Sequence, residues 1–334
     1  MKFLIIGDVH YRAENPRSRL DNYQKAITAK LLEAFELAQE HKVTAILQTG
    51  DLFDSPGIAW DTVKQLALLL NGSPCPFITI PGTHDAWAHN LATLYRTPFS
   101  LLSALSIIRD ASAEGLGFND GDILITGHGY NYETDTVVGQ HQYTPPEHVN
   151  DAFHIHLVHA MLLDHIPVEG MKHTLISQVD TNADVIVAGH VHYGLGHGNY
   201  IHRRDDGVLF VNPGALCRKE ASWVEMERPV QVALLTVENG RVKVELIPLK
   251  SARPGFEILS RRHIEEAHER SAQIDEFLRL LASEGEAKFM EVREIVEDIA
   301  ARDNIPGDVK AEALRRIGEA REKLGTVAGT ADVA

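Results

Sequence analysis

The chain has 334 residues, of which 44% are hydrophobic and 24% charged, and its formal net charge is -15. This composition is typical of a soluble globular protein with room for one large domain and a smaller one. The negative net charge argues against a protein that binds nucleic acid over its whole surface. A nuclease stays compatible with it, because carboxylates that hold metals add to the negative charge.

Targeting signals are not evident in the pattern. No apolar run reaches the ~18 residues of a membrane span, so we expect no membrane association. The opening MKFLIIGDVH lacks the length and the small-residue cleavage site of a signal peptide. Two cysteines, Cys75 and Cys217, do not suggest a disulfide framework. These features predict a cytoplasmic protein.

The first eighty residues alternate between strand and helix patterns. Apolar runs over 2–7, 43–51 and 76–82 predict buried strands, and helical periods over 20–41 and 57–71 predict the helices between them. This alternation favours an α/β layer with a mainly parallel sheet.

The middle of the chain is richer in strands. Four apolar runs stop at glycine, histidine or both; they cover residues 122–128, 153–159, 184–190 and 207–214. Two alternating runs around Asn239–Gly240 then predict a hairpin, since both of these residues tolerate positive φ. The strand-rich domain is therefore expected to close near Pro248.

After Pro254 the composition becomes charged and helical in period. Helices are predicted over 262–283, 287–302 and 307–324, followed by a frayed tail. We therefore divide the chain into a domain over 1–253 and a helical C-terminal extension over 254–334.

Aspartates and histidines gather in five short motifs, each directly after or at the end of a predicted strand. These motifs are Asp8-Val9-His10, Gly50-Asp51, Gly82-Thr83-His84-Asp85, His159 and Gly189-His190-Val191-His192. Ligands of open α/β sheets bind at the carboxyl edge, where such loops converge. Aspartate and histidine together suit divalent manganese, iron or zinc. A shared carboxylate, Asp51, can bridge two ions about 4 Å apart, and an extended Asp8-Val9-His10 would place both ligands on one side of the backbone.

This series of motifs resembles the calcineurin-like metallophosphoesterase superfamily. The resemblance implies a layered α/β sandwich of two mixed sheets flanked by helices, here with the helical extension, so that 1–253 would be the catalytic domain. It implies two divalent metal ions, manganese above all. The first metal would be held by Asp8, His10, Asp51 and His192, and the second by Asp51, Thr83, His159 and His190. His84 would contact the phosphate and protonate the leaving oxygen, and Asp54 would orient His84.

A narrower resemblance covers about residues 1–257. The stretches GDLFD, VNPGAL and LIPLKSARPGFEIL are similar to SbcD-type DNA-repair and recombination nucleases, including compact bacteriophage subunits. This resemblance implies DNA as a partner, an SbcC-type coiled-coil ATPase docked on the C-terminal helices, and a homodimer. Two features depart from the pattern. The family usually has asparagine where Thr83 stands, which predicts a looser second metal. SbcD relatives carry a mixed capping element, whereas residues 258–324 have a wholly helical pattern, which predicts a reduced or absent cap.

Several residues keep a second interpretation. Asp54 could instead cap the helix that follows, Asp85 could hydrogen-bond its own loop, and His128 is interpreted as a structural or rim residue. Four basic residues are either solvated charges or phosphate contacts; they are Arg203, Arg204, Arg218 and Lys219. Of these we select Arg218 as the candidate substrate contact.

The predicted function is hydrolysis of DNA phosphodiesters by an exonuclease or endonuclease subunit, through a hydroxide activated by two metals, with His84 assisting the leaving group. One alternative is a phosphoesterase for a small nucleotide or a lipid phosphodiester, which the acidic surface supports. The other is a non-catalytic scaffold whose metal site has decayed around Thr83.

Overall fold

The computed structural model describes residues 1–145, 152–196, 198–238, 240–262, 265, 295–303 and 305–328. The chain divides into two compact units, Met1–Ser260 and Arg261–Ala334. In the second unit helix α8, Gly307–Ala328, confirms the helix predicted over 307–324. Nearly all of the predicted helix 262–283 and half of 287–302 lie outside the described residues, as do the last residues of the predicted tail.

The first sheet has six strands in the order β14-β13-β1-β2-β3-β4. β1, β2, β3 and β4 run parallel, and β13 and β14 join them as an antiparallel hairpin. The bounds are Lys2–Ile6 (β1), Ala45–Gln48 (β2), Phe77–Thr79 (β3), Arg109–Asp110 (β4), Gln231–Glu238 (β13) and Arg241–Pro248 (β14). The predicted hairpin is confirmed by the pairing of Glu238 with Arg241, although Asn239 itself lies outside the described residues.

The second sheet also has six strands, in the order β11-β12-β10-β7-β6-β5. Its four inner strands run parallel, and the two edge strands β5 and β11 are antiparallel to their neighbours. The bounds are Leu116–Phe118 (β5), Ile123–His128 (β6), Phe153–Ala160 (β7), Val185–His190 (β10), Ile201–Arg203 (β11) and Leu209–Val211 (β12). A separate parallel pair joins Leu162–Leu163 (β8) to Thr174–Leu175 (β9).

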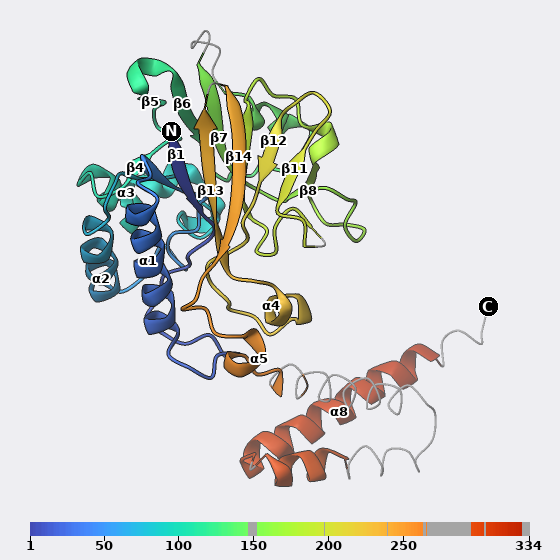
Figure 1. The fold of residues 1–334 in the computed structure, drawn as a ribbon. Helices are drawn as coiled ribbons and strands as arrows, with labels where there is room; N and C mark the ends of the chain where they lie inside the picture. The colour runs from blue at the N-terminus through green and yellow to red at the C-terminus, as the bar shows by residue number, and fades with distance from the viewer. Residues whose placement is uncertain are drawn as a thin grey trace, which may run out of the picture. The chain divides into compact units, whose positions relative to one another are not determined.

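The helices of the first unit flank the first sheet and the loops around it (Figure 1). They are α1 (Tyr23–Glu40), α2 (Trp60–Asn71), α3 (Pro98–Ala104), α4 (Trp223–Glu227) and α5 (Gly255–Ile258). Short 3-10 helices span Trp87–His89 (η1), Leu91–Arg96 (η2), Asn119–Gly121 (η3), Val138–Tyr143 (η4) and Ile176–Gln178 (η5). α1 begins three residues later than predicted, because Asn22 caps it by accepting a hydrogen bond from Lys25 N, and Leu20 is left 65% exposed.

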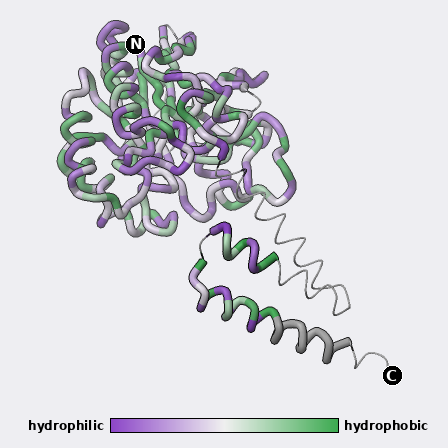
Figure 2. The backbone as a smooth tube through the Cα atoms, turned by 90° about the horizontal axis from the view of Figure 1, so that it is seen from below, coloured by the Kyte–Doolittle hydropathy of each residue, from purple (hydrophilic) through white to green (hydrophobic). Residues whose placement is uncertain are grey.

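Alternation along the strands divides the core into layers. In β1, Phe3 and Ile5 pack between the two sheets, whereas Leu4 and Ile6 pack beneath α1. The hydrophobic segments accordingly gather in the interior of the first unit (Figure 2). Two mixed sheets with flanking helices and a helical C-terminal part confirm the predicted fold class. In the part of the chain that the structure describes, no helix is both long and apolar enough to cross a membrane.

Candidate metal centre

The predicted ligands converge where strands of both sheets reach their carboxyl ends. Asp8 follows β1 and Asp51 follows β2, while His159 and His190 lie at the ends of β7 and β10. Asp8, Asp51 and His159 are each only 1% exposed. Buried carboxylates and imidazoles need a compensating partner, so their neighbours decide what this site can bind.

The first group of ligands surrounds the ring of His10. Its Nε2 lies 3.3 Å from Nε2 of His192 and 3.5 Å from Oδ2 of Asp51. His192 Nε2 in turn lies 3.5 Å from Oδ2 of Asp8. The Sγ of Cys217 is also within 4.8 Å of ring nitrogens of His10 and His192. These four predicted ligands are thus close enough to hold one cation.

The second group surrounds the other side of Asp51. Ligand atoms of Asp51, His159 and His190 all lie within 4.8 Å of one another. His159 Nδ1 donates to the carbonyl of Thr49 at 2.8 Å, so the lone pair of Nε2 faces Asp51 Oδ2 at 3.3 Å. This Nε2 is buried and has no hydrogen-bond partner. Two acceptors that face each other this closely fit a bound cation, and nitrogen with carboxylate oxygen suits a borderline divalent ion.

Asp51 dominates the electrostatics of the centre. Burial raises the pKa of Asp51, but His159 and His10 beside it hold that pKa well below its usual range. Burial alone lowers the pKa of His159, yet the charge of Asp51 raises it to about 10. Burial lowers the pKa of His10 to about 4 and that of His190 to about 3, so both imidazoles stay neutral at pH 7. The negative charge of Asp51 therefore stabilises one positive charge between Asp51 and His159. Either a proton on His159 or a bound metal cation can supply it.

Backbone conformation brings these side chains together. His10, Asp51 and His190 have φ values of 49°, 52° and 76°, in the left-handed region that non-glycine residues seldom adopt. The expectation of an extended Asp8-Val9-His10 segment is therefore wrong. At Gly82 a Cβ would lie 2.3 Å from Asp51 Oδ1, so only glycine lets the loop after β3 approach the shared carboxylate.

Thr83 is placed against the shared carboxylate. Its hydroxyl donates to Asp51 Oδ2 at 2.9 Å, with Oδ1 at 3.2 Å. The backbone N–H of His84 donates to Asp51 Oδ1 at 2.6 Å. The hydroxyl proton of Thr83 thus orients Asp51. The hydroxyl oxygen of Thr83 remains a weak candidate ligand for the second cation.

Asp54 contacts His84 with a different atom from the one expected. His84 Nδ1 donates to the backbone carbonyl of Asp54 at 2.8 Å, which leaves His84 Nε2 to face a substrate. The Asp54 carboxylate lies instead 3.3 Å from His10 Nδ1 and 2.6 Å from both Arg12 Nη1 and Lys219 Nζ. A carboxylate beside the far nitrogen of a metal-binding histidine holds its ring in place, so the side chain of Asp54 orients His10.

Arg218, the expected substrate contact, points away from the centre. Its guanidinium donates to the carbonyls of Arg253, at 2.6 Å, and Arg228, and the side chain is buried. The neighbouring Lys219 reaches the centre instead, with Nζ 3.1 Å from His10 Nδ1. Arg204 pairs with Asp206, and His128 donates to the carbonyl of Gly129, so neither joins the two ligand groups.

Two further residues at the centre were not predicted. Glu225, held by Arg228 at 2.8 Å, lies 3.7 Å from His192 Nδ1, and Tyr130 stacks on His190 at 5.6 Å between ring centroids. The spacing of Ser222 and Glu225 predicts a helix start, which the structure has at α4, but not the contact with His192. Asp85 accepts hydrogen bonds from Gly82, Leu52 and Phe53, which fixes the loops that carry Asp51 and Thr83.

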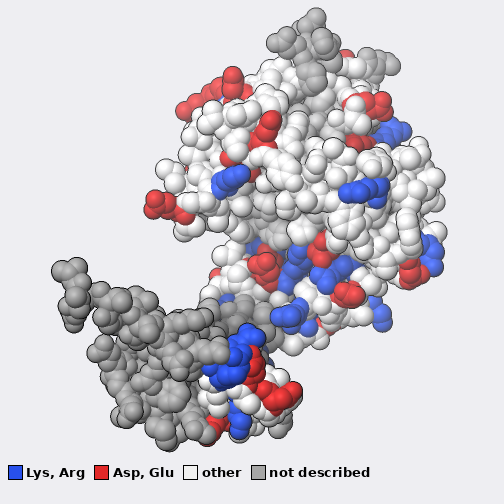
Figure 3. Space-filling model, turned by 180° about the vertical axis from the view of Figure 1, so that it is seen from behind, with Lys and Arg blue, Asp and Glu red and all other residues white. Residues whose placement is uncertain are grey.

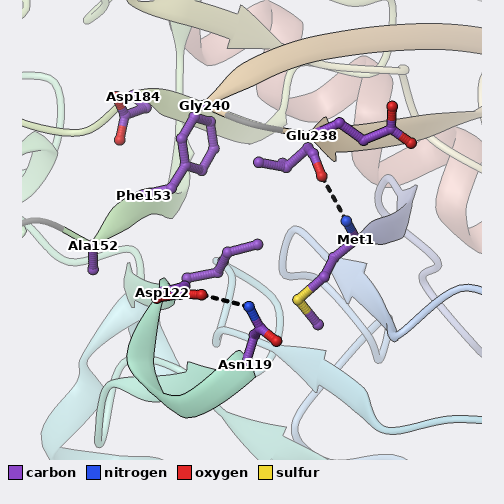
Figure 4. A pocket seen from close by; sticks show the side chains of 10 residues that line it. Met1, Asn119, Asp122, Ala152, Phe153, Asp184, Glu238 and Gly240 are labelled. Atoms are coloured by element: carbon purple, nitrogen blue, oxygen red, sulfur yellow. Dashed lines mark hydrogen bonds between the residues drawn. The ribbon is translucent and has the colours of Figure 1, made fainter.

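A pocket of about 690 Å³ lies at the other end of the sandwich, where β6 and β7 begin. Met1, Asp122, Phe153 and Asp184 line it (Figure 4). Two of its carboxylates have donors: Asp122 accepts from Asn119, and Asp184 from His154 N. None of the predicted metal ligands lines this pocket, so it is separate from the metal centre.

The sequence matches the family model described as calcineurin-like phosphoesterase over residues 1–194. A curated relative, the DNA double-strand break repair protein Mre11 of Thermoplasma acidophilum, is 24% identical over 248 residues, which cover 72% of this chain. The match covers 64% of that relative, so the chain spans less than two thirds of its length.

Similar solved structures include TT1561 of Thermus thermophilus, with 14% identity, a TM-score of 0.45, and coverage of 73% of this chain and 98% of that one. A dimetal phosphatase from Danio rerio has 10% identity, a TM-score of 0.46, and coverage of 74% and 96%. The 5'-nucleotidase precursor of Thermus thermophilus has 12% identity, a TM-score of 0.42, and coverage of 77% and 56%.

Proposed function

Because the chain belongs to the calcineurin-like phosphoesterase family, we propose that it is a metal-dependent phosphodiesterase that cleaves DNA as the nuclease subunit of a repair or recombination complex. The relative from Thermoplasma acidophilum is a DNA double-strand break repair protein, which supports the choice of DNA. The proposed catalytic domain is 1–253, and the proposed extension is 254–334.

The position of Asp51 carries the proposal. Its Oδ2 lies 3.5 Å from Nε2 of His10 on one side and 3.3 Å from Nε2 of His159 on the other. A carboxylate between two imidazole lone pairs is the arrangement that a bridging ligand of two cations requires. We assign the first cation to Asp8, His10, Asp51 and His192, and the second to Asp51, His159 and His190 with a weak contribution from Thr83.

The bound cations would supply an activated water and neutralise charge on the phosphoryl group. The oxygen and nitrogen donors of the centre are compatible with manganese, which we propose as the native metal. His84 takes the role of general acid, because its Nδ1 is fixed by the Asp54 carbonyl and its Nε2 can give a proton to the leaving oxygen. Lys219 and Asp54 keep His10 oriented for the first cation.

Partners are proposed from the resemblance and from exposed apolar surface. An SbcC-type coiled-coil ATPase would dock on the C-terminal helices, of which α8 is described and carries an exposed Val309. A homodimer would bury apolar side chains of the first unit such as Trp60 and Leu68 on α2, which are 73% and 68% exposed.

The test measures hydrolysis by the purified full chain with Mn²⁺, with and without the ATPase. The substrates are single-stranded DNA, double-stranded DNA and bis(p-nitrophenyl) phosphate. His84→Ala is expected to lower the rate by about a hundredfold or more, and the exposed His141→Ala is the matched histidine control.

The rival functions give different results in the same experiment. Hydrolysis of the p-nitrophenyl ester without any cleavage of DNA would indicate a small phosphodiester substrate. A non-catalytic scaffold would bind at most one metal ion, and His84→Ala would leave every rate unchanged.

A further inference from the structure

The second cation group has an aromatic neighbour that takes no part in holding metal. The ring of Tyr130 stacks on His190 at 5.6 Å and 29°, and it meets the edge of His159 at 6.3 Å. The exposed ring of His89 lies 5.9 Å from Tyr130, nearly perpendicular to it. We call Tyr130 and His89 the aromatic wall.

Two loops are built so that these rings stay in place. The loop after β6 runs against Pro81, where a Cβ on Gly129 would lie 2.5 Å from the proline ring. Ala88 and His89 have φ values of 50° and 56°, and His89 Nδ1 donates to the carbonyl of Thr83 at 2.9 Å. The hydroxyl of Tyr132 donates to the carbonyl of Ala88. Strained backbone held by such contacts is found mostly at functional sites.

The charge of the protein makes an aromatic contact useful. A chain with a net charge of -15 gains little from long-range attraction to phosphates. On the face shown in Figure 3, basic side chains of the first unit occur in small groups beside acidic ones rather than as a continuous track. Stacking of a base on an aromatic ring needs no positive charge and tolerates any sequence.

We propose that the aromatic wall packs against the base of the nucleotide next to the scissile phosphate. Tyr130 is half-buried against the ligands of the second cation and half-exposed, so a phosphate at the metals brings the adjoining nucleoside to this ring. A base is free to stack only when it is unpaired, so the favoured substrate is a single strand or a frayed end. This inference rests on the proposed nuclease function and specifies its substrate.

The test combines variants of Tyr130 with abasic DNA. Wild type, Tyr130→Ala and Tyr130→Phe are assayed with Mn²⁺ on a labelled single strand, and on the same strand with one abasic residue on either side of the cleaved bond. Tyr130→Ala is expected to lower kcat/KM about tenfold on the intact strand, mainly through KM, and to have no effect when the stacked base is missing. Tyr130→Phe keeps the ring and should behave like wild type. Tyr95→Ala, at an exposed tyrosine of η2, is the matched control.

A purely structural role for Tyr130 gives a different result. If Tyr130 only supports His190, then Tyr130→Ala loses bound metal and lowers kcat/KM by the same factor on intact and abasic strands. This result overturns the inference. An unchanged kcat/KM for Tyr130→Ala on the intact strand overturns it as well. Metal content is therefore measured for each variant.

A second pair of substrates separates the aromatic wall from the nuclease proposal. Thymidine 5'-p-nitrophenyl phosphate and methyl p-nitrophenyl phosphate share a leaving group and differ in the nucleoside. Tyr130→Ala should reduce the preference for the thymidine ester about tenfold. Cleavage of both esters without cleavage of DNA would refute the nuclease proposal, while the ester preference would still decide whether Tyr130 binds a nucleoside.

Discussion

Two neighbouring regions of the first unit bury charge in opposite ways. In the metal centre, acceptors face acceptors, as with Asp51 Oδ2 and the Nε2 atoms of His10 and His159. Behind the loop 215–219 lies a group of buried cations, which we call the cation layer and define as Lys30, Arg218 and Arg228. In the cation layer each charged end is directed at backbone carbonyl oxygens.

The comparison separates charges that the protein satisfies itself from charges that need a ligand. Lys30 Nζ donates to Leu216 O at 2.8 Å, and Arg228 donates to Ala215 O at 2.8 Å as well as to Glu225. The charged ends of the cation layer thus have acceptors within the protein, although Arg218 Nε is buried without a hydrogen-bond partner. In the metal centre, Nε2 of His159 has no partner and faces an oxygen of Asp51. Ionisable side chains are buried in both regions, and the direction of the hydrogen bonds distinguishes them.

The largest effect is expected at the carboxylate that both ligand groups share. Asp51→Asn removes the negative charge between His10 and His159, so we expect loss of both cations and a fall in hydrolysis on the order of a thousandfold. Mn²⁺ should raise the melting temperature of wild type but not of Asp51→Asn, because only wild type binds the cations. Elemental analysis and thermal unfolding with and without chelator measure this. Retention of two ions by Asp51→Asn would disprove the shared-ligand assignment.

The next largest effect is expected from breaking the cation layer. Arg228→Met leaves Glu225 buried and unpaired, so we expect a loss of about 3–5 kcal/mol in the free energy of unfolding. Urea denaturation measures this loss. The double variant Arg228→Met with Glu225→Leu is the control and should recover part of it, since no uncompensated carboxylate remains. A loss below about 1 kcal/mol for the single variant would mean that solvent reaches Glu225.

The strands and the loops that carry ligands could be predicted from the sequence. Apolar runs end at Asp8, Asp51, His159 and His190 because parallel strands lead into their loops at one edge, so the motif order already indicated which residues meet. The left-handed φ of His10 could not be predicted, since nothing in Asp8-Val9-His10 distinguishes it from extended backbone.

The sequence indicated the right segments but not which atoms are in contact. Asp54 reaches His84 through its carbonyl and His10 through its carboxylate, and this division depends on tertiary contacts with Arg12 and Lys219. Arg218 and Lys219 are adjacent in the chain, so their side chains point in different directions. Composition alone could not show that Lys219, rather than Arg218, reaches the metal centre. Lys30 lies between apolar residues of α1, and the sequence alone would predict an exposed lysine there. Its burial depends on the tertiary contact with the carbonyl of Leu216.

A smaller effect is expected at Thr83, where the second cation group departs from the family pattern. Thr83→Asn offers a carbonyl oxygen that reaches further than the hydroxyl, so we expect the second metal to bind about tenfold tighter and activity to be kept or raised. Calorimetric titration of Mn²⁺ and steady-state rates measure this. Thr83→Val, which removes the donor to Asp51 at similar size, is the control. A clear loss of activity in Thr83→Asn would show that the hydroxyl itself has a specific role.

The smallest effect is expected at Lys30, and it tests how far the cation layer replaces the hydration of its buried charges. Burial lowers the pKa of Lys30 from its usual 10.5 to about 7. Between these two values the unfolded chain binds more protons than the folded chain, so raising the pH stabilises the wild type. Lys30→Met does not titrate and lacks this contribution. The stability of wild type relative to Lys30→Met should therefore rise between pH 7 and pH 8, by at most about 1.4 kcal/mol, as measured by urea denaturation. Lys25→Met, at an exposed lysine of the same helix, should show no such trend. Parallel stability profiles for wild type and Lys30→Met would mean that Lys30 stays charged in the fold, because the carbonyl of Leu216 and its surroundings compensate the ammonium group as fully as water does.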